Sequence, residues 1–455
     1  MATATTLLIL GATGDLTSRL LLPALGQLLA REPERRVHLR GVGRRAWTDD
    51  EWRETVRTAF AAADAEDVFT SLVDTTYTRA DITDADDLAK LIAEPTGRLA
   101  LYFAVPPAVA AAACESLKDV DLPDDTVLAL EKPFGVDEDS ARKLNATVTH
   151  LVPEEQVFRI DHFLGRATLL NVLGARFANR LFMPVWSAEH IESVLIRYDE
   201  TLGLEDRAGY YDHAGALVDM IQSHLLQVLA IVAMEPPATL ERRDLRDAIG
   251  TVLRATHVWG DDPATASRRA RYTAGSVDGV PLPSYVDESG VDPSRDTETL
   301  AELTCEVRNE RWAGVPFTLR SGKALASKDG EIVVTFRPVN HVPVGLTGDA
   351  PGTVLRFSLG PDRMDLDLNV NGGENPFGLG RATLSTDLGE GALRAYGEVL
   401  SGILDGDATL SVRADAAEQS WHIVDPVIAA WRRGDVPLEE YSAGTEGPSG
   451  WPRPA

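Results

Sequence analysis

The stretch RIDHFLGR, residues 159–166, places an aspartate, a histidine and an arginine close together in the chain. Such a group can act as an acid/base pair beside a cation that holds an anion, because imidazole exchanges protons near neutral pH. The same side chains can also be ordinary polar residues at the end of an element. Asp161, His162 and Arg166 are therefore candidates whose role depends on the rest of the chain.

A second candidate is His224, which lies in the long apolar segment YYDHAGALVDMIQSHLLQ, where an ionisable side chain needs a reason. The chain has nine histidines, so any single one is more often structural than catalytic. Asp219 precedes His224 by five positions, which is about 140° around an α-helix. We therefore expect these two side chains to share a ligand rather than a hydrogen bond. Asp161 is a carboxylate that the sequence allows as partner of His224 but does not place.

The segment GATGDLTSR, residues 11–19, follows a short apolar run and opens a helical pattern. A turn at this place presents backbone N–H groups and a helix N-terminus to a pyrophosphate. Its spacing is G-x-x-G with Thr17 in place of a third glycine, and by itself it is equally typical of a plain tight turn. The segment is a candidate cofactor loop because of its context.

The next predicted strand ends in GVGRR, which puts Arg44 and Arg45 where the ribose of a bound dinucleotide would lie. The acidic residue that would hold a free 2′-hydroxyl is missing at this point. The pair therefore favours NADP over NAD, although two arginines can also simply solvate a loop.

Other basic residues stand at separate places: Lys132 in LALEKPFG, and Lys323 with Lys328 in LRSGKALASK. Each of them alone is most simply a solvated cation. Lys132 is the least ordinary, because it follows a strand predicted to be buried, and ligands bind at the carboxyl ends of such strands.

The elements expected around these residues form two domains. In residues 1–160, apolar runs alternate with helical, Ala-rich stretches, which predicts a doubly wound, Rossmann-like α/β domain with strands at 6–10, 37–42, 98–105 and 125–131. Residues 161–455 predict an α+β domain with a large, mainly antiparallel sheet, whose strands lie at 191–200, 303–308, 331–337, 353–359 and 363–370. Long helices are expected at 209–234 and 389–404, and the tail after Tyr441 is expected to be irregular.

Composition excludes several classes of protein. The formal charge, 44 basic minus 70 acidic residues, is −26, which disfavours binding to nucleic acid or to an anionic membrane. An anionic substrate would therefore need locally clustered cations. Cys114 and Cys305 lie far apart and lack metal-ligand spacing, so no disulfide or metal site is expected. No segment has the pattern of a signal peptide or of a membrane span, and we expect a cytoplasmic protein.

Taken together, a series of segments in sequence order resembles the glucose-6-phosphate dehydrogenase family. They are GATGDLTSR, GVGRRAWTDDEWR, YFAVPP, EKPFG, RIDHFLGR, RFANRLFMPVW, the 200–227 stretch, WAGVPFTLRSGKALASK, YGEVLSGILDGDATLSVRAD and WHIVDPVI. They cover nearly the whole chain, and RIDH-x-LG and EKPFG are among the more specific. Their common order argues against a chance match.

The resemblance implies an oxidoreductase that transfers a hydride from C1 of glucose 6-phosphate to NADP and yields 6-phosphogluconolactone, the entry to the pentose phosphate pathway. It implies that His224 is the general base and that Asp161 is its partner. Implied sugar and phosphate ligands are Glu200, Asp219, Lys132, Lys323, Lys328, His162 and Arg166. Implied cofactor contacts are Gly11, Thr13, Gly14, Asp15, Leu16 and Lys132, with Arg44 and Arg45 on the 2′-phosphate. The resemblance also implies a homodimer or homotetramer.

The chain departs from the family pattern on the sugar side. Phe163 and Arg166 stand where the family usually has Tyr and Lys, and Ser223 stands where Asn usually precedes the histidine. The strand that usually reads R-x-Q-P-[DN]-E is RFSLGPDRMD at 356–365. Two alternatives therefore stay open: the same chemistry on another hexose phosphate or on a non-phosphorylated hexose derivative, or a non-catalytic homologue with a regulatory role.

Overall fold

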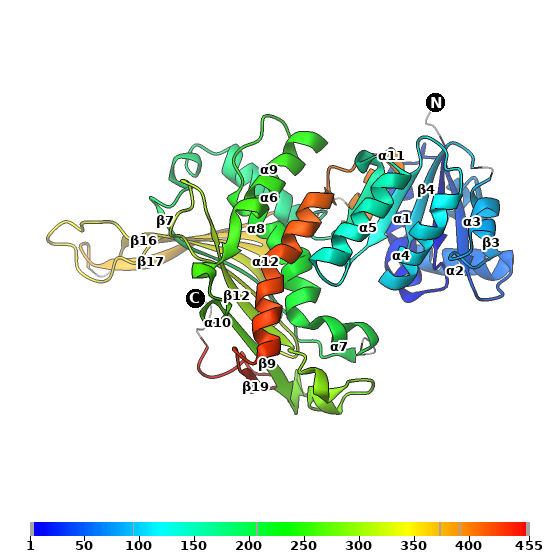
Figure 1. Ribbon diagram of the computed structural model, residues 1–455. Helices are drawn as coiled ribbons and strands as arrows, with labels where there is room; N and C mark the ends of the chain where they lie inside the picture. The colour runs from blue at the N-terminus through cyan, green and yellow to red at the C-terminus, as the bar shows by residue number, and fades with distance from the viewer. Residues whose placement is uncertain are drawn as a thin grey trace. The chain divides into compact units, whose positions relative to one another are not determined.

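The computed structural model describes residues 4–93, 95–205, 208–372, 375–389, 391 and 393–451 of the 455-residue chain. The chain divides into two compact units, and each is built from separate stretches (Figure 1). The first unit runs to Arg166 and also takes Pro237–Asp247 and Gly391–Glu418. The second unit takes Ala167–Pro236, Ala248–Glu390 and the chain from Gln419 onward. The functional division that we expect at residue 160 stays a prediction.

The first unit is organised around a seven-stranded sheet in the order β18-β6-β5-β4-β1-β2-β3. All neighbouring pairs from β6 to β3 are parallel, and β18 is antiparallel to β6. This order is that of a dinucleotide-binding domain and confirms the predicted fold class. The strands are β1 (Thr5–Leu10), β2 (Val37–Gly43), β3 (Asp74–Arg79), β4 (Arg98–Phe103), β5 (Val127–Glu131), β6 (Val157–Ile160) and β18 (Ser411–Val412).

Helices cover this sheet, and a late segment of the chain completes its core. Leu400 and Ile403 of α11 join the same apolar cluster as Leu25 and Leu28 of α1. The helix expected at 389–404 begins only at Ala395, because the backbone of Arg394 is extended, with φ −65° and ψ 158°. The helices are α1 (Leu22–Arg31), α2 (Asp49–Ala61), α3 (Ala85–Ile92), α4 (Pro107–Ser116), α5 (Glu138–Leu151) and α11 (Ala395–Asp405).

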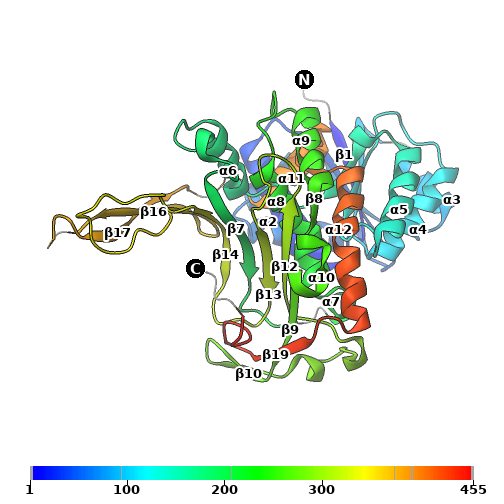
Figure 2. The same ribbon diagram turned by 60° about the vertical axis from the view of Figure 1, so that its left-hand side comes forward.

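The second unit contains a ten-stranded sheet in the order β17-β16-β15-β14-β7-β13-β12-β9-β19, with β8 paired to β12. It is mainly antiparallel, as predicted, but β7 is parallel to β13 and β9 is parallel to β19. Figure 2 shows the β16–β17 hairpin extending beyond the other strands of this sheet. The strands are β7 (Ile191–Asp199), β8 (Thr256–Val258), β9 (Ser267–Thr273), β12 (Leu300–Val307), β13 (Phe317–Gly322), β14 (Asp329–Phe336), β15 (Val354–Leu359), β16 (Asp362–Asn371), β17 (Leu379–Asp387) and β19 (Leu438–Ser442).

The apolar segment that carries His224 is helical, but the single helix predicted at 209–234 is wrong in two respects. Gly215, with φ 64° and ψ 178°, breaks it, and Leu217–Leu225 is a π-helix between α7 (Ala208–Ala216) and α8 (Leu226–Ala233). The run is long and apolar enough to cross a membrane, yet its most apolar window is 94% buried within the protein, as in a core helix. Further helices are α6 (Ala167–Phe177), α9 (Arg242–Ala255), α10 (Pro263–Ala266) and α12 (Ala414–Arg433).

The C-terminal tail after Tyr441 is largely irregular in secondary structure, as predicted, but it packs into the second unit. Strand β19 includes Ser442, and Thr445 forms a bridge with Leu325. Trp451 is 7% exposed, and its indole N–H donates to Glu439 at 2.8 Å. The tail is therefore part of the core of the second unit, because a tryptophan supplies the burial that its Gly- and Pro-rich neighbours lack.

Candidate active site

The predicted cofactor loop lies at the carboxyl end of β1, where the neighbouring parallel strands also end. Gly11 has φ 97°, and a Cβ atom there would lie 2.2 Å from the Ala104 carbonyl oxygen, so only glycine fits. The Gly14 N–H donates to the Gly11 carbonyl at 3.0 Å, and the chain is helical from Asp15 onward. A glycine turn that leads directly into a helix suits a bound pyrophosphate, so these residues fit a dinucleotide.

Arg44 and Arg45 follow β2 at the same edge of the sheet, and both side chains are exposed. Their backbone carbonyls are fixed: the Tyr77 hydroxyl donates to Arg45 at 2.8 Å and the Arg79 Nε donates to Arg44 at 3.1 Å. Neither guanidinium forms an ion pair with the residues that the structure describes. The backbone that carries these two exposed cations is thus fixed.

Lys132 follows β5 at this edge, directly after Glu131. The Tyr102 hydroxyl donates to Glu131 at 2.5 Å. Burial raises the pKa of Glu131 to about 7, against the lowering effects of that hydrogen bond and of the Lys132 charge. A carboxyl group that titrates near neutral pH therefore lies next to a proposed ligand residue.

Asp161 and His162 lie in a tight turn directly after β6. Asp161 is 1% exposed, and its carboxylate accepts a hydrogen bond from the Phe163 N–H at 2.9 Å. The His162 ring stacks on Tyr396 of α11 with centroids 5.4 Å apart and planes 14° from parallel. Both side chains are therefore held by contacts within the first unit.

Phe163 and Arg166 form a stacked pair in the same turn. The Arg166 Cζ atom lies 4.2 Å from the centroid of the Phe163 ring, which is 2% exposed. A guanidinium stacks flat on an aromatic face in a way that a compact ammonium does not. The two departures from the family pattern are therefore in contact, and the Phe163 ring supports the Arg166 cation.

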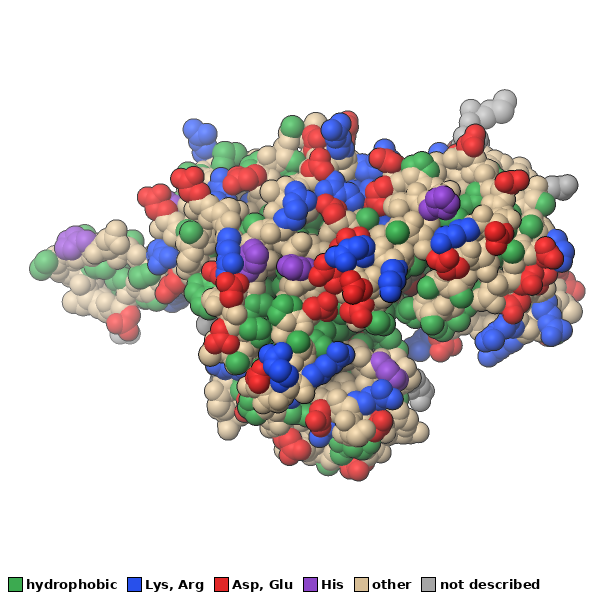
Figure 3. Space-filling view, viewed as in Figure 1, with side chains coloured by type: hydrophobic (Ala, Val, Ile, Leu, Met, Phe, Trp, Pro, Cys, Tyr) green, Lys and Arg blue, Asp and Glu red, His purple; other side chains and the backbone are tan. Residues whose placement is uncertain are grey.

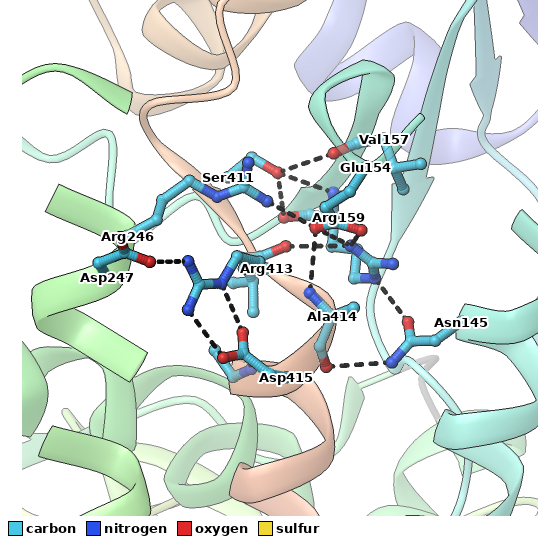
Figure 4. A network of polar contacts seen from close by, with 12 residues as sticks. Asn145, Glu154, Val157, Arg159, Arg246, Asp247, Ser411, Arg413, Ala414 and Asp415 are labelled. Atoms are coloured by element: carbon cyan, nitrogen blue, oxygen red, sulfur yellow. Dashed lines mark hydrogen bonds and ion pairs between the residues drawn. The ribbon is translucent and has the colours of Figure 1, made fainter. Parts of the chain in front are cut away.

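A buried ionic network fixes β6, the strand that leads into this turn (Figure 4). Arg159 is 1% exposed and donates to Glu154 at 2.9 Å and to Asn145 at 2.8 Å. Arg246 donates to the same Glu154 at 2.8 Å, while the Ser411 hydroxyl accepts from the Arg159 N–H at 3.0 Å. Segments that are distant in the sequence are thereby joined to the end of β6.

In the second unit, Glu200 and Lys323 lie side by side because they follow β7 and β13, which are parallel neighbours. Their side chains form an ion pair with 2.7 Å between Lys323 Nζ and Glu200 Oε2. The Lys323 Nζ also lies 5.3 Å from the centroid of the Tyr211 ring. Lys328, in contrast, is exposed and forms no ion pair with the described part of the chain.

Asp219 and His224 are 2% and 1% exposed, and both lie on the π-helix. Their separation of about 140°, which we expected for an α-helix, is wrong. A π-helix bonds residue i to residue i+5, so residues five apart lie about one turn apart on nearly the same side. The Ser223 hydroxyl donates to the Asp219 carbonyl at 2.5 Å within this helix. The carboxylate and the imidazole therefore lie about one turn apart on one buried helix.

The sequence did not reveal Glu298, which precedes β12. It is 6% exposed, and burial raises its pKa to about 7, opposed chiefly by a hydrogen bond from Leu217. Its Oε1 accepts from the Leu217 N–H, the first residue of the π-helix, at 2.9 Å. The only signal in the sequence is a glutamate before an apolar strand, which does not reveal a contact this distant.

The altered segment at 356–365 forms β15, a turn and the start of β16. Arg356 pairs with Asp367, and Arg363 pairs with Asp365 at 2.8 Å between Nε and Oδ2. These side chains are therefore engaged within the hairpin.

Comparisons with known proteins agree with this architecture. Residues 8–171 match the family model described as glucose-6-phosphate dehydrogenase, NAD binding domain, and residues 173–452 match glucose-6-phosphate dehydrogenase, C-terminal domain. The glucose-6-phosphate 1-dehydrogenase of Gluconobacter oxydans is 40% identical over 97% of this chain and 94% of its own length. That of Mycolicibacterium smegmatis is 36% identical over 97% and 93%.

Solved structures give the same result. A glucose-6-phosphate dehydrogenase in complex with its substrate glucose 6-phosphate superposes with a TM-score of 0.86 at 29% identity, covering 99% of this chain and 96% of that one. The glucose-6-phosphate 1-dehydrogenase of Mycobacterium avium gives a TM-score of 0.83 at 32% identity, covering 98% and 95%. The chain therefore belongs to the glucose-6-phosphate dehydrogenase family.

Proposed function

We propose that the protein oxidises glucose 6-phosphate at C1 with NADP as the hydride acceptor and yields 6-phosphogluconolactone. The observation that carries this proposal is the pair Asp219 and His224, both buried and presented by one turn of a π-helix in a chain of this family. A binding module has no need of a buried imidazole and a buried carboxylate on one helix.

In this proposal, His224 accepts the proton of the C1 hydroxyl, and the hydride on C1 leaves for the nicotinamide. The substrate loses one proton and one hydride, and a lactone remains. A neutral imidazole is suited to this task because it accepts a proton near neutral pH. We propose Asp161 as the carboxylate that stabilises the imidazolium, and Glu200, Asp219 and Lys132 as ligands of the sugar hydroxyls.

We propose that the substrate carries a phosphate. Acidic and basic side chains are interspersed on the face drawn in Figure 3, so an anion there must be held by particular cations. Lys323 is already neutralised by Glu200. His162 and Arg166 are therefore proposed as the main phosphate ligands, with Lys323 and Lys328 lining the site.

NADP is proposed as the cofactor, with Gly11, Thr13, Gly14, Asp15 and Leu16 along its pyrophosphate. Arg44 and Arg45 support this, since both are exposed and without ion pairs among the described residues. A 2′-phosphate would supply the negative charge that pairs with the two guanidinium groups. A free 2′-hydroxyl would offer them no ionic partner.

The test measures NADPH absorbance when purified protein meets NADP with glucose 6-phosphate, glucose, glucosamine 6-phosphate or other hexose phosphates. We expect glucose 6-phosphate to give by far the highest kcat/KM. If another sugar gives the highest kcat/KM, we conclude that Phe163 and Arg166 belong to a pocket with a changed substrate preference. If none reacts while NADPH still binds, the protein is a non-catalytic homologue.

A homodimer is also proposed, with a homotetramer as its extension. Exposed apolar side chains gather on the β16–β17 hairpin and on the loops next to it: Val339, Val344, Val370, Phe377 and Leu384. Apolar side chains exposed together on an extended hairpin are typical of a subunit interface. Light scattering of the Leu384→Asp variant tests this, because a charge there should shift the protein toward the monomer.

We further propose that the protein is cytoplasmic, since both cysteines are buried as free thiols. The cofactor is assigned to residues 1–160, and sugar binding and subunit contacts are assigned to residues 161–455. Assay of cell fractions for NADP-dependent activity tests the location.

A further inference from the structure

Residues 297–299 form a short strip that joins two parts of the second unit. On one side, the Ala216 N–H donates to the Glu298 carbonyl at 3.3 Å, and the Leu217 N–H donates to the Glu298 carboxylate at 2.9 Å. On the other side, the Lys323 N–H donates to the Thr299 carbonyl at 2.8 Å. The strip therefore bonds both to the start of the π-helix and to the backbone of Lys323.

The fit around Glu298 is close. Gly215 lies against its carboxylate, and a Cβ atom on that residue would be 2.3 Å from Glu298 Oε1. Gly215 also has the left-handed φ of 64°, which a larger residue rarely adopts. The chain is thus shaped to bring the carboxylate onto the N–H of Leu217, the first residue of the π-helix.

The chemistry of this contact suits a helix start. The first N–H groups of a helix have no partners within the helix, so an acceptor oxygen at this place satisfies one of them. Glu298 is 6% exposed, so few water molecules can replace it as an acceptor. Loss of the carboxylate would leave a buried N–H unsatisfied, which destabilises this turn in particular.

We infer that Glu298 is a positioning residue for the proposed reaction, because it fixes the π-helix that carries Asp219 and His224 relative to Lys323. The inference rests on the proposed function and deepens it. A displacement of reacting groups by about 1 Å can cost on the order of 100-fold in rate, so one buried contact at the helix start is enough to control turnover.

The test compares three substitutions of Glu298. Glu298→Met keeps the length but removes both acceptor oxygens, Glu298→Asp withdraws the carboxylate by one methylene, and Glu298→Gln keeps one acceptor. We expect kcat to fall about 10- to 100-fold in the Met variant and about tenfold in the Asp variant, while the Gln variant stays within about threefold. The KM for NADP should not change, because the cofactor loop lies in the first unit.

Glu302 supplies the matched control. It is a partly buried glutamate on β12, and burial also raises its pKa, but Arg268 and Arg320 are the charges that oppose this effect. Glu302→Met should lower the melting temperature without a comparable loss of kcat per folded enzyme. If Glu302→Met and Glu298→Met lose equal kcat, or if Glu298→Asp and Glu298→Met both keep the wild-type kcat, the inference is overturned.

Hydrogen exchange gives a second readout that does not need activity. Amides of residues 217–225 should exchange faster in the Met variant, and rescue by Gln should restore their protection. Unchanged exchange in the Met variant overturns the inference. A wild-type protein that turns over no sugar overturns the proposed function alone, because the exchange measurement still tests the role of Glu298 in the helix. If the Met variant fails to fold, the kcat and the hydrogen exchange of the Asp variant test the inference instead.

Discussion

The two units hold their candidate residues in different ways. In the first unit, the residues lie in turns directly after parallel strands, so the sheet itself brings them to one edge. In the second unit, Asp219 and His224 lie on a π-helix whose start is fixed by Glu298, about eighty positions later in the chain. We therefore expect a substitution in the first unit to change only the contacts of the substituted residue. A substitution of Glu298 should instead change the positions of Asp219 and His224, because it acts through the helix.

The largest effect is expected where the second unit does chemistry. His224→Asn removes the proposed base but keeps a polar side chain of similar size, so kcat should fall by about 100- to 10,000-fold. Steady-state assays with glucose 6-phosphate measure this, and fluorescence titration should show nearly unchanged NADPH binding. Near wild-type turnover would show that His224 is not the general base. It would also contradict the idea that the second unit carries the chemical step. Ser223→Ala is the neighbouring control, since the Ser223 hydroxyl donates to the Asp219 carbonyl within the helix, and this variant should change kcat less than about threefold.

The pH dependence of stability separates the buried carboxyl groups of the two units. The pKa of Glu298 is about 7 in the folded protein and near 4.5 when unfolded, so folding favours the protonated form. Its contribution to stability is therefore complete below pH 4.5 and is lost as the pH rises through 7. Since each pKa unit corresponds to about 1.4 kcal/mol, the charge costs up to about 3 kcal/mol above pH 8.

Glu298→Gln should therefore be more stable than the wild type at pH 8.5 and equal to it near pH 5, as judged by denaturation midpoints. Glu131→Gln in the first unit should show the same sign, because burial also raises the pKa of Glu131 to about 7. An equal difference at both pH values would show that the charge of Glu298 is not responsible.

Arg44→Ala combined with Arg45→Ala tests whether effects in the first unit stay local. Loss of charge-assisted contacts to a 2′-phosphate should lower the preference for NADP over NAD by about 10- to 100-fold. The ratio of kcat/KM for the two cofactors measures this, and the KM for glucose 6-phosphate should not change. Arg53→Ala is a control, because this partly exposed arginine pairs with Asp49 and Asp50 on α2. A rise in the KM for glucose 6-phosphate would contradict the expectation that substitutions of Arg44 and Arg45 have only local effects.

The same contrast explains how much could be predicted. The doubly wound class of the first unit followed from alternating apolar runs, and the cofactor loop followed from a glycine turn after a buried strand. The polar strand β3, with the sequence DTTYTR, was missed because its edge position needs little burial.

In the second unit, the sequence identified His224 and Asp219 but placed them on the wrong sides of a helix. A π-helix has no pattern of its own in the sequence, since apolar residues on all sides fit either turn. The contact with Glu298 depends on tertiary packing over a long separation, and no local rule predicts it. Likewise, Trp451 orders a tail whose Gly and Pro content indicated a loop.

The smallest effect is expected for Phe163 and Arg166, and it tests whether two neighbouring departures act as one. Arg166→Lys should raise the KM for glucose 6-phosphate about five- to tenfold, because an ammonium is not held flat on the Phe163 ring and offers fewer donors. Phe163→Tyr in the same chain adds a hydroxyl donor and should recover part of this loss. The two changes lie in contact, so the double-mutant cycle should give a coupling of at least about 0.5 kcal/mol in kcat/KM. Strictly additive effects would mean that the stacking has no role in substrate binding. The difference between the two units would then be supported only by the variants of Arg44 and Arg45.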